Sequence, residues 1–318
     1  MGNKITSKPI TTQAKANSKP KTNVKVVKKQ SQKTTSDKIL SYFGEHNMVN
    51  VGKKQAAKIK ATVEDIAQNG GAMEKLTKLS VVHRAYEAAK KHDDLYAPLD
   101  QSIGGGPYGD DCADDEFYWA ACELYLTTGE KAYLKDLEKS DLADTIPATL
   151  SAGEDADTAG SFDWGNTAAF GTLSLALHKD DLEKKTAEKV TSAITDAADV
   201  HLGREEQQGY GQPYAQSKLS YADDDTGYVW GSNSFVADNA VILAAAYDLT
   251  GEQNYLNGVI SAMDYLLGRN PMDVSYITGY GSHAVQYPHH RYWAHQISEE
   301  YPMAPAGVLV GGPNSGMQ

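Results

Sequence analysis

Residues 275–291 combine side chains that bind polar ligands with residues that interrupt helices. The segment holds three histidines, one arginine, three tyrosines, two glycines and one proline. Glycine and proline are unfavourable inside helices, so these residues are predicted to form a long ordered loop. Loops that carry cationic side chains such as His289 and Arg291 are common sites of binding. The segment is therefore the first candidate for a ligand site.

The adjacent histidines of this segment also raise the question of a metal site. Adjacent histidines on a loop rarely converge on one ion, and no His-Glu-x-x-His motif or third ligand at a typical spacing accompanies His289 and His290. Zinc is not the favoured interpretation. A cationic pair can instead donate hydrogen bonds to hydroxyl groups and orient a carboxylate.

Aromatic residues gather in the predicted loops, and sugars suit such rings because they present C–H faces beside hydroxyl edges. A single aromatic residue is more often part of a core than a binding platform. Trp230 is the exception, because it stands between Gly227 and Gly231 in a segment that precedes a predicted helix. The aromatic residues concerned are Tyr108, Trp164, Tyr210, Tyr214, Tyr228, Trp230, Tyr280, Tyr287, Tyr292 and Trp293.

The elements that position these loops are predicted to be helices in antiparallel pairs. One helix runs through residues 116–126, capped by Asp114 or Asp115, and stops at Gly129; another runs through 237–249 and stops at Gly251. The sequences around these two stops match in Gly, Glu, Tyr and Leu at an offset of 122 residues. Residues 173–182 give a looser helix–turn–helix between them. Because the chain has almost none of the alternating apolar and polar residues typical of β-strands, an all-α array or toroid of helical hairpins is predicted. The alternative is that two good helix stops arose separately.

Charge divides the chain into a basic start and an acidic body. Residues 1–36 contain nine Lys and no acidic residue, which leaves 21 basic and 42 acidic residues for the remainder. The start is predicted to be a disordered tail, and residues 37–81 a helical segment of unclear origin. A body this acidic repels phosphate, so nucleic acid is excluded as a partner, whereas a neutral polymer is not.

Membrane and secretion signals are weak. No apolar run approaches the length of a membrane span, so no membrane partner is expected. Residues 1–6 fit the short myristoylation pattern, which is too loose to carry a prediction, and the start lacks the apolar region of a secretory signal peptide.

Several ordered segments together resemble the glycoside hydrolase family 9 enzymes, the inverting cellulases. They are residues 275–291 with the flanking segments 268–272 and 311–314, the Trp-Gly-Ser segment at 228–233, and residues 108–121. His283 departs from the pattern, because the family usually has Asn, Lys or Arg there. The resemblance covers about residues 82–318, the expected incomplete catalytic domain. It implies part of an (α/α)6 toroid of antiparallel helical hairpins with long loops on the active face.

The resemblance also implies a function and its residues. The reaction would be hydrolysis of β-1,4-glucan with inversion by an extracellular enzyme, with cello-oligosaccharides as partners and no cofactor required for chemistry. His289 and Arg291 would belong to the catalytic site as the pair that contacts the glycan. The expected substrate-binding residues are Trp230, Tyr228, Trp164 and Tyr287.

A structural calcium ion is a further implication. The family pattern places the ligands at the side chains of Asp115 and Glu116, with oxygens from Asp111 and Cys112. Clustered carboxylates suit Ca²⁺, which takes six to eight oxygen ligands. The family has a further Asp after a Trp, and this chain has Gly165 there, so Asp163 or Asn166 would have to substitute. The alternative is that the acidic residues only favour a helix start.

Both catalytic carboxyl groups of the family are expected to lie outside these 318 residues. The Asp-Ala-Gly-Asp segment that supplies the base is absent, and the acid Glu follows the loop matched by residues 311–314. Two hypotheses follow: a fragment of a secreted cellulase, or a non-catalytic glycan-binding remnant. A third, another toroid enzyme such as a sugar epimerase, disagrees with the loop motifs.

Overall fold

The computed structural model describes residues 81–96, 112–151, 153, 155–219 and 226–316. The predicted tail at 1–36 and residues 37–80 of the predicted helical segment lie outside these ranges, as do Tyr108 and Asp111.

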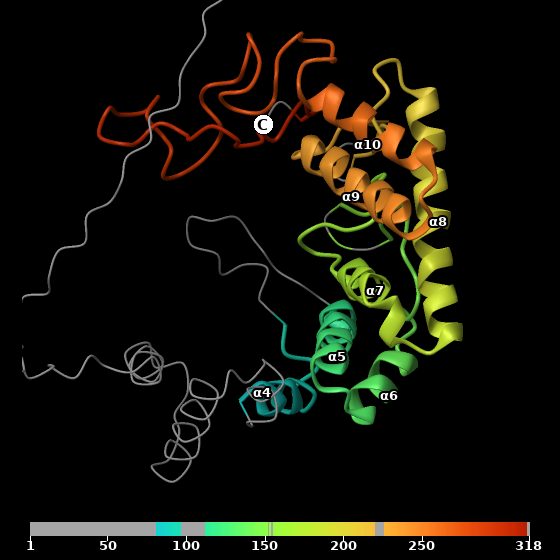
Figure 1. The fold of residues 1–318 in the computed structure, drawn as a ribbon. Coiled ribbons are helices and arrows are strands. Elements are labelled where there is room, and N and C mark those ends of the chain that lie inside the picture. The colour runs from blue at the N-terminus through green and yellow to red at the C-terminus, as the bar shows by residue number, and fades with distance from the viewer. Residues whose placement is uncertain (1–80, 97–111, 152, 154, 220–225, 317–318) are drawn as a thin grey trace, which may run out of the picture. The chain divides into compact units, whose positions relative to one another are not determined.

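Helices supply nearly all of the regular secondary structure of the described residues, and long loops make up most of the remainder, as Figure 1 shows. The all-α prediction is confirmed. One short 3-10 turn (Lys179–Asp181) and one two-stranded antiparallel ribbon, with Ser217 opposite Gly227, interrupt the helical pattern. The helices are α4 (Val81–Ala89), α5 (Asp114–Thr128), α6 (Lys131–Lys139), α7 (Ala168–Leu177), α8 (Lys184–Gln207), α9 (Ser232–Thr250) and α10 (Gln253–Leu266), and the strands are β1 (Ser217–Lys218) and β2 (Thr226–Gly227).

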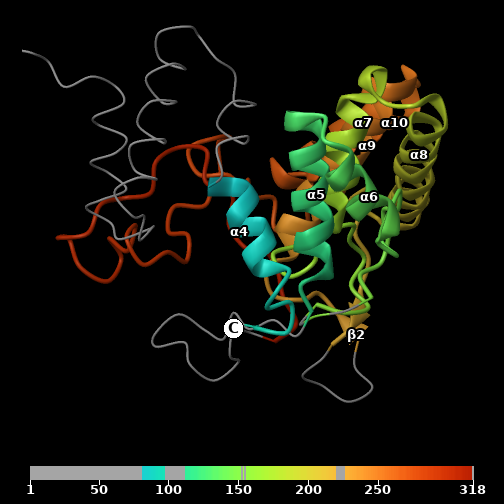
Figure 2. The same ribbon diagram turned by 90° about the horizontal axis from the view of Figure 1, so that it is seen from below.

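Six of the helices form three successive hairpins: α5 with α6, α7 with α8, and α9 with α10. Helix α5 packs on both α6 and α7, and α8 packs on α7, α9 and α10. Figure 2 shows this arrangement from a second direction. Each hairpin therefore contacts the next one in chain order, as expected for a stacked helical array.

The repeat at an offset of 122 residues is also a repeat of geometry. Gly129 and Gly251 both adopt left-handed backbone, with φ of 67° and 74°, and each donates its N–H to the carbonyl four residues earlier. The threonine before each glycine donates to a carbonyl of its own helix at 2.7 Å, Thr128 to Leu124 and Thr250 to Ala246. The same residues produce the same turn twice, so the sequence match reflects a shared way of ending a helix.

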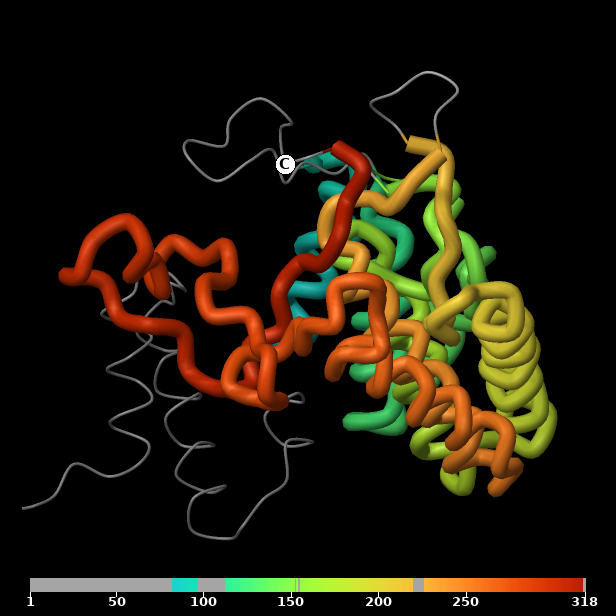
Figure 3. The backbone as a smooth tube through the Cα atoms, turned by 90° about the horizontal axis from the view of Figure 1, so that it is seen from above, coloured from blue at the N-terminus to red at the C-terminus, as the bar shows by residue number. Residues whose placement is uncertain are grey.

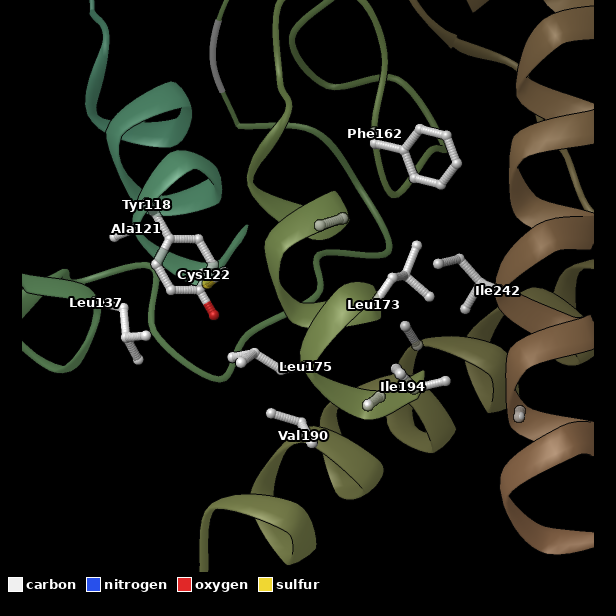
Figure 4. Close-up of a cluster of buried hydrophobic side chains, with 14 of the residues drawn as sticks. Tyr118, Ala121, Cys122, Leu137, Phe162, Leu173, Leu175, Val190, Ile194 and Ile242 are labelled. Atoms are coloured by element: carbon white, nitrogen blue, oxygen red, sulfur yellow. The ribbon is translucent and has the colours of Figure 1, made fainter. Parts of the chain in front are cut away.

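Two apolar clusters hold the array together. The first lies between the helices and includes Tyr118 and Cys122 of α5, Leu175 of α7 and Ile194 of α8, all nearly inaccessible to solvent (Figure 4). The second cluster packs the start of α9 and the end of α10 against loop residues, among them Leu150, Tyr214, Val229 and Tyr276. The long loops are thus built around a core of their own.

The two ends of the array differ in the length of their connections. At one end, α5 joins α6 and α9 joins α10 through two-residue turns. At the other end, where α5, α7 and α9 begin, the connections run over residues 140–167, 208–231 and 267–316. Long, ordered loops on a helical scaffold are where binding residues concentrate. The functional site is therefore expected at this long-loop end.

The predicted cap of α5 is wrong. The N-cap residue is Ala113, which makes no side-chain capping bond, and both Asp114 and Asp115 lie inside the first helical turn. Asp115 does not cap its own helix because its carboxylate accepts hydrogen bonds from Thr167, at the start of α7.

Among the described residues, no helix combines the length and the apolar character that crossing a bilayer would require.

We expect alanine to change the free energy of unfolding in opposite directions at two glycines, one in the left-handed turn at position 251 and one inside α8. Gly251→Ala should lower the free energy of unfolding by about 1 kcal/mol, because a Cβ is unfavourable at φ of 74°. Gly203→Ala should raise it by up to about 1 kcal/mol, because Gly203 lies inside α8 with open space beside it. Urea denaturation of both variants checks the pair; a Gly251→Ala variant as stable as the wild type would contradict the turn geometry.

Candidate functional site

The start of α9 presents Trp230 to solvent on a backbone that is fixed on both sides. Trp230 is 56% exposed, whereas Val229 before it is buried. Gly231 after it is the N-cap of α9 and has left-handed backbone, with φ of 79°. The backbone at Trp230 is therefore held by its neighbours while the indole stays accessible.

The first turn of α9 binds directly to the segment 310–313. Asn233 donates its backbone N–H to the carbonyl of Gly311 and its side-chain amide to the carbonyl of Val310, both at 3.0 Å. The hydroxyl of Ser232 donates to the carbonyl of Pro313 at 2.6 Å. The Trp-Gly-Ser-Asn segment and the Gly-Gly-Pro-Asn segment, far apart in sequence, thus form one structural unit.

Tyr228 completes this unit from the other side. Its backbone N–H and carbonyl both bond to Ser315, at 3.0 Å and 2.8 Å. Its hydroxyl accepts a hydrogen bond from the amide of Gln212 at 2.7 Å, and its ring packs edge-on against Tyr214. Figure 3 shows the last described residues returning to this part of the chain. Tyr228 is half-buried and hydrogen-bonded within the unit, whereas Trp230 is exposed at its edge.

The first part of the predicted binding loop is tied to the same unit. Residues 275–278 lie between residues 283–285 and 308–310: Ser275 donates its N–H to His283 at 2.7 Å, and Val310 donates to Tyr276 at 3.0 Å. The bond at His283 uses the backbone carbonyl, and the imidazole is exposed. The backbone bond does not depend on the side chain at 283, so it accommodates the departure from the family pattern.

The second part of the loop carries Tyr287, His289 and Arg291, all of them exposed. His290 between them has a structural role, because its Nδ1 accepts the backbone N–H groups of Tyr292 and Trp293 at 3.1 Å and 3.0 Å. The His290 ring also stacks on Trp293, with ring centres 4.2 Å apart. The two adjacent histidines therefore have different environments: His290 bonds to the backbone of its own loop, and His289 is exposed.

Trp164 lies at the tip of a tight turn that precedes α7. The Oδ1 of Asp163 accepts hydrogen bonds from the backbone of Gly165 at 3.0 Å and from the side chain of Asn166 at 2.8 Å. The indole of Trp164 is 47% exposed. Burial raises the pKa of Asp163. The pKa of Asp238 on α9 is raised to about 7 by its own burial and by the negative charge of Asp163. Both carboxyl groups lie near the start of α7 and α9.

Asp238 was not recognised in the sequence as a candidate functional residue. It stands in the helical run 235–246, which is otherwise nearly all apolar. An isolated Asp in such a run is the signal that would have indicated a desolvated carboxyl group.

The calcium ligands expected from the resemblance are only partly within the described residues. Asp111 lies outside them, Cys112 and Glu116 are exposed, and Asp115 uses Oδ2 to accept the N–H and hydroxyl of Thr167 at 2.6 Å and 3.0 Å. Across the described ranges, no three His, Cys, Asp or Glu side chains come together in a way that could hold a metal. These residues alone do not complete a site, and calcium stays a prediction.

A groove of about 740 Å³ opens beside the first turn of α5. Its walls include Tyr86 of α4, Asp115 and Phe117 of α5, and Ser161 and Asn166 of the segment that carries Trp164. The groove is mixed in character, because its aromatic rings stand beside five aspartates, two lysines and the amide of Asn166.

The site residues expected from sequence therefore fall into three groups at the long-loop end. Trp230 and Tyr228 lie together just before α9, Trp164 lies just before α7, and Tyr287, His289 and Arg291 lie on the predicted binding loop at 275–291, here called the C-terminal loop. The described hydrogen bonds join the first group to the base of the loop that carries the third.

Comparison with known proteins agrees with this geometry. The model of glycosyl hydrolase family 9 matches residues 77–318. The chain is 45% identical over 239 residues to cellulose 1,4-beta-cellobiosidase of Acetivibrio thermocellus, covering 73% of this chain and 26% of that protein. It is 40% identical over 240 residues to endoglucanase C of Cellulomonas fimi, covering 75% of this chain and 20% of that protein.

The fold comparison leads to the same family. A solved family 9 glycoside hydrolase from Bacteroides ovatus matches with a TM-score of 0.57 at 30% identity, covering 77% of this chain and 45% of that one. The chain belongs to glycosyl hydrolase family 9, and its hairpins are part of the (α/α)6 toroid. It spans about a quarter or less of the two curated relatives named above.

The contact between Gly312 and Asn233 predicts a stability difference between two glycines with similar backbone. Gly312 has φ of 89°, and a Cβ there would overlap the side chain of Asn233; Gly307 has φ of 97° with open space around it. Gly307→Ala should cost about 1–2 kcal/mol of folding free energy through backbone strain alone. Gly312→Ala should cost about 1–3 kcal/mol more, because the added methyl overlaps its neighbour. Thermal unfolding of both variants tests this, and equal losses would mean that the contact with Asn233 does not constrain position 312.

Proposed function

We propose that this chain supplies part of the glycan-binding face of a β-1,4-glucan hydrolase that acts with inversion. The observation that carries the proposal is the unit formed by residues 228–233 and 308–315 at the long-loop end of the array, with Trp230 exposed at its edge. The names of the two relatives, a cellobiosidase and an endoglucanase, support β-1,4-glucan as the substrate class.

Trp230 is suited to stack on a glucose ring. An indole offers a wide flat apolar face, which matches the C–H face of a sugar, while the hydroxyl edge stays available to polar groups. The backbone at 229–231 is already ordered, so little conformational entropy is lost when a sugar binds. Trp164 offers a second exposed indole at the start of the neighbouring hairpin.

His289 and Arg291 are proposed to contact the glycan near the reacting bond. The turn closed by His290 orders the backbone of residues 290–293, which includes Arg291 and directly follows His289. Both side chains can donate hydrogen bonds to sugar hydroxyl groups, and the planar guanidinium of Arg291 can also hold a carboxylate in one orientation. Tyr287, exposed on the same segment, adds an aromatic face beside them.

Inverting hydrolysis needs two carboxyl groups, one to protonate the leaving oxygen and one to activate water. The segments that supply them in the family are expected to lie outside these 318 residues. The proposed contribution of these residues is therefore to bind and orient the glucan. Asp273, Glu299 and Glu300 lie near the C-terminal loop, and no family motif assigns them a catalytic role.

The glycan role of Trp230 predicts a selective loss of binding. Trp230→Ala should weaken cellohexaose binding by about three- to tenfold, as loss of an aromatic contact would, and Trp230→Phe should retain most of it. Leu177→Ala is a matched control, because Leu177 is 67% exposed at the short-turn end. Isothermal titration of the folded chains measures the three affinities. Wild-type affinity in Trp230→Ala would refute the proposed contact.

A structural calcium ion is also proposed, held through Asp115 and Glu116 with oxygens from Asp111 and Cys112. Ligands that bind only the native state raise its stability by mass action. Excess EDTA should therefore lower the melting temperature, and added CaCl₂ should restore it in the wild type but not in Glu116→Gln. If the melting temperature is indifferent to both additions, the acidic residues serve only the helix start and the bond to Thr167.

The chain by itself is expected to hydrolyse carboxymethyl cellulose negligibly compared with a complete family member. General acid–base catalysis contributes roughly 10²–10⁴-fold per group, so the absence of both matched carboxyl groups should leave little activity. Reducing-sugar release by the purified, folded chain measures it. Robust turnover that is lost on changing Glu299 or Glu300 would show that an acid near the C-terminal loop performs the chemistry. Glycan binding without turnover is the result expected under both hypotheses, a fragment of a cellulase and a non-catalytic glycan-binding remnant.

A further inference from the structure

His201 and Arg204 lie one turn apart on α8 and face the segment that leads to Trp164. His201 is completely buried, at 0% exposure, and Arg204 is half-buried. Buried imidazole and guanidinium groups are unfavourable unless their hydrogen-bonding atoms are satisfied. Their partners therefore indicate why the fold keeps them there.

The hydrogen bonds of this pair have a defined direction. Arg204 donates from Nη1 to the carbonyl of Ala148 at 2.5 Å and from Nη2 to the hydroxyl of Thr149 at 2.8 Å. Its Nη1 also lies 3.1 Å from Nδ1 of His201. A guanidinium only donates, so Nδ1 is the acceptor and the imidazole proton is on Nε2. Nε2 lies 2.8 Å from Oγ of Ser161 and donates to it.

The neutral state of His201 keeps this arrangement unchanged with pH. Burial and the positive charge of Arg204 lower the pKa of His201 to about 3. A protonated Nδ1 could not accept from Arg204, and near neutral pH that form is not populated. The network is thus a permanent link and not a titrating switch.

The network fixes both ends of one loop to a single turn of α8. Residues 148–149 and Ser161 flank a loop that is closed by two backbone hydrogen bonds. The N–H of Leu150 donates to the carbonyl of Thr158, and the N–H of Asp157 donates to the carbonyl of Leu150, both at 2.9 Å. Leu150 is 1% exposed and anchors the loop in the second apolar cluster. Residues 148–150, 157–158 and Ser161 can therefore move relative to α8 only if these bonds break.

Trp164 follows Ser161 by three residues. Phe162 between them is buried and packs on Phe170 of α7, with ring centres 4.6 Å apart. Asp163 then closes the turn that presents Trp164. Because this path is short and packed, displacement of Ser161 shifts the base of the turn and with it the exposed indole.

We propose that His201 and Arg204 are positioning residues for glycan binding, holding Trp164 in place through Ser161. This role rests on the proposed function, in which Trp164 is part of the glycan-binding face. Neither residue touches the ligand. The link explains why a fully buried histidine and a half-buried arginine stand at this point of α8.

The test compares cellohexaose affinity in four variants of the whole chain. His201→Ala should bind about threefold or more weakly than the wild type, approaching the loss in Trp164→Ala. The double variant should bind no more weakly than Trp164→Ala alone, because residues that act through one another are not additive. Ile194→Ala is the matched control: Ile194 is buried on the same helix, within the first apolar cluster, so this variant should be destabilised yet keep wild-type affinity.

A conservative variant separates positioning from general destabilisation. His201→Gln retains an N–H close to Nε2 and should restore affinity to within about twofold of the wild type. Hydrogen exchange of the segment 148–166 should accelerate in His201→Ala and not in Ile194→Ala. Should His201→Ala fail to fold, Ser161→Ala, which removes only the acceptor, takes its place with the same expectations.

The outcomes distinguish this inference from the function on which it rests. If Trp164→Ala binds weakly while His201→Ala and Ser161→Ala bind normally, the positioning role is wrong and the glycan role of Trp164 stands. If Ile194→Ala loses as much affinity as His201→Ala, the effect is general destabilisation and the positioning role is wrong. If Trp164→Ala binds as the wild type does, the glycan role of Trp164 and the positioning role fail together.

Discussion

The hydrogen bonds between the first turn of α9 and the carbonyl groups of residues 310–313 are the interaction on which the long-loop end depends. A C-terminal segment without helix or ladder would leave its backbone groups unpaired, and such groups are costly when they are buried. Ser232 and Asn233 satisfy three carbonyls of this segment from a rigid helix start. Once residues 310–313 are fixed, residues 275–278 have a partner for their own backbone bonds, and the base of the C-terminal loop becomes ordered.

The helical framework supplies what this interaction requires, namely a helix start that does not move. The three hairpins are closed by short turns at one end and packed by an apolar cluster drawn from every helix pair. Each hairpin directs its long connections to the same end, so the aromatic residues of the starts of α7 and α9 are presented on one side. Stability and recognition are thus divided between the two ends of one array, a division typical of scaffolds that carry binding loops.

Much of the framework could be predicted from sequence, because the relevant signals are local. The stops at Gly129 and Gly251 follow from left-handed backbone that glycine adopts easily, and the match of the neighbouring threonines extends to identical hydrogen bonds. The motifs at 228–233 and 311–314 were each recognised, but their contact was not, since nothing in either segment specifies a partner some 80 residues away. The capping prediction for Asp115 failed for the same reason: its partner, Thr167, lies 52 residues further along the chain. His201 and Arg204 were missed because a helical His and Arg three residues apart look like ordinary surface residues until burial is known.

The unequal lengths of the connections have a consequence for how such an array can vary. A two-residue turn that needs a glycine at one position has no room for an insertion, since any added residue would break the bonds that end one helix and begin the next. The loops at the other end are held at a few points by hydrogen bonds to the helix starts, and the stretches between those points are free to differ in length and composition. Substrate preference can therefore diverge among descendants of one scaffold while the packing register of the helices is kept. Recombination between relatives should succeed when the crossover falls within a loop between two anchor points.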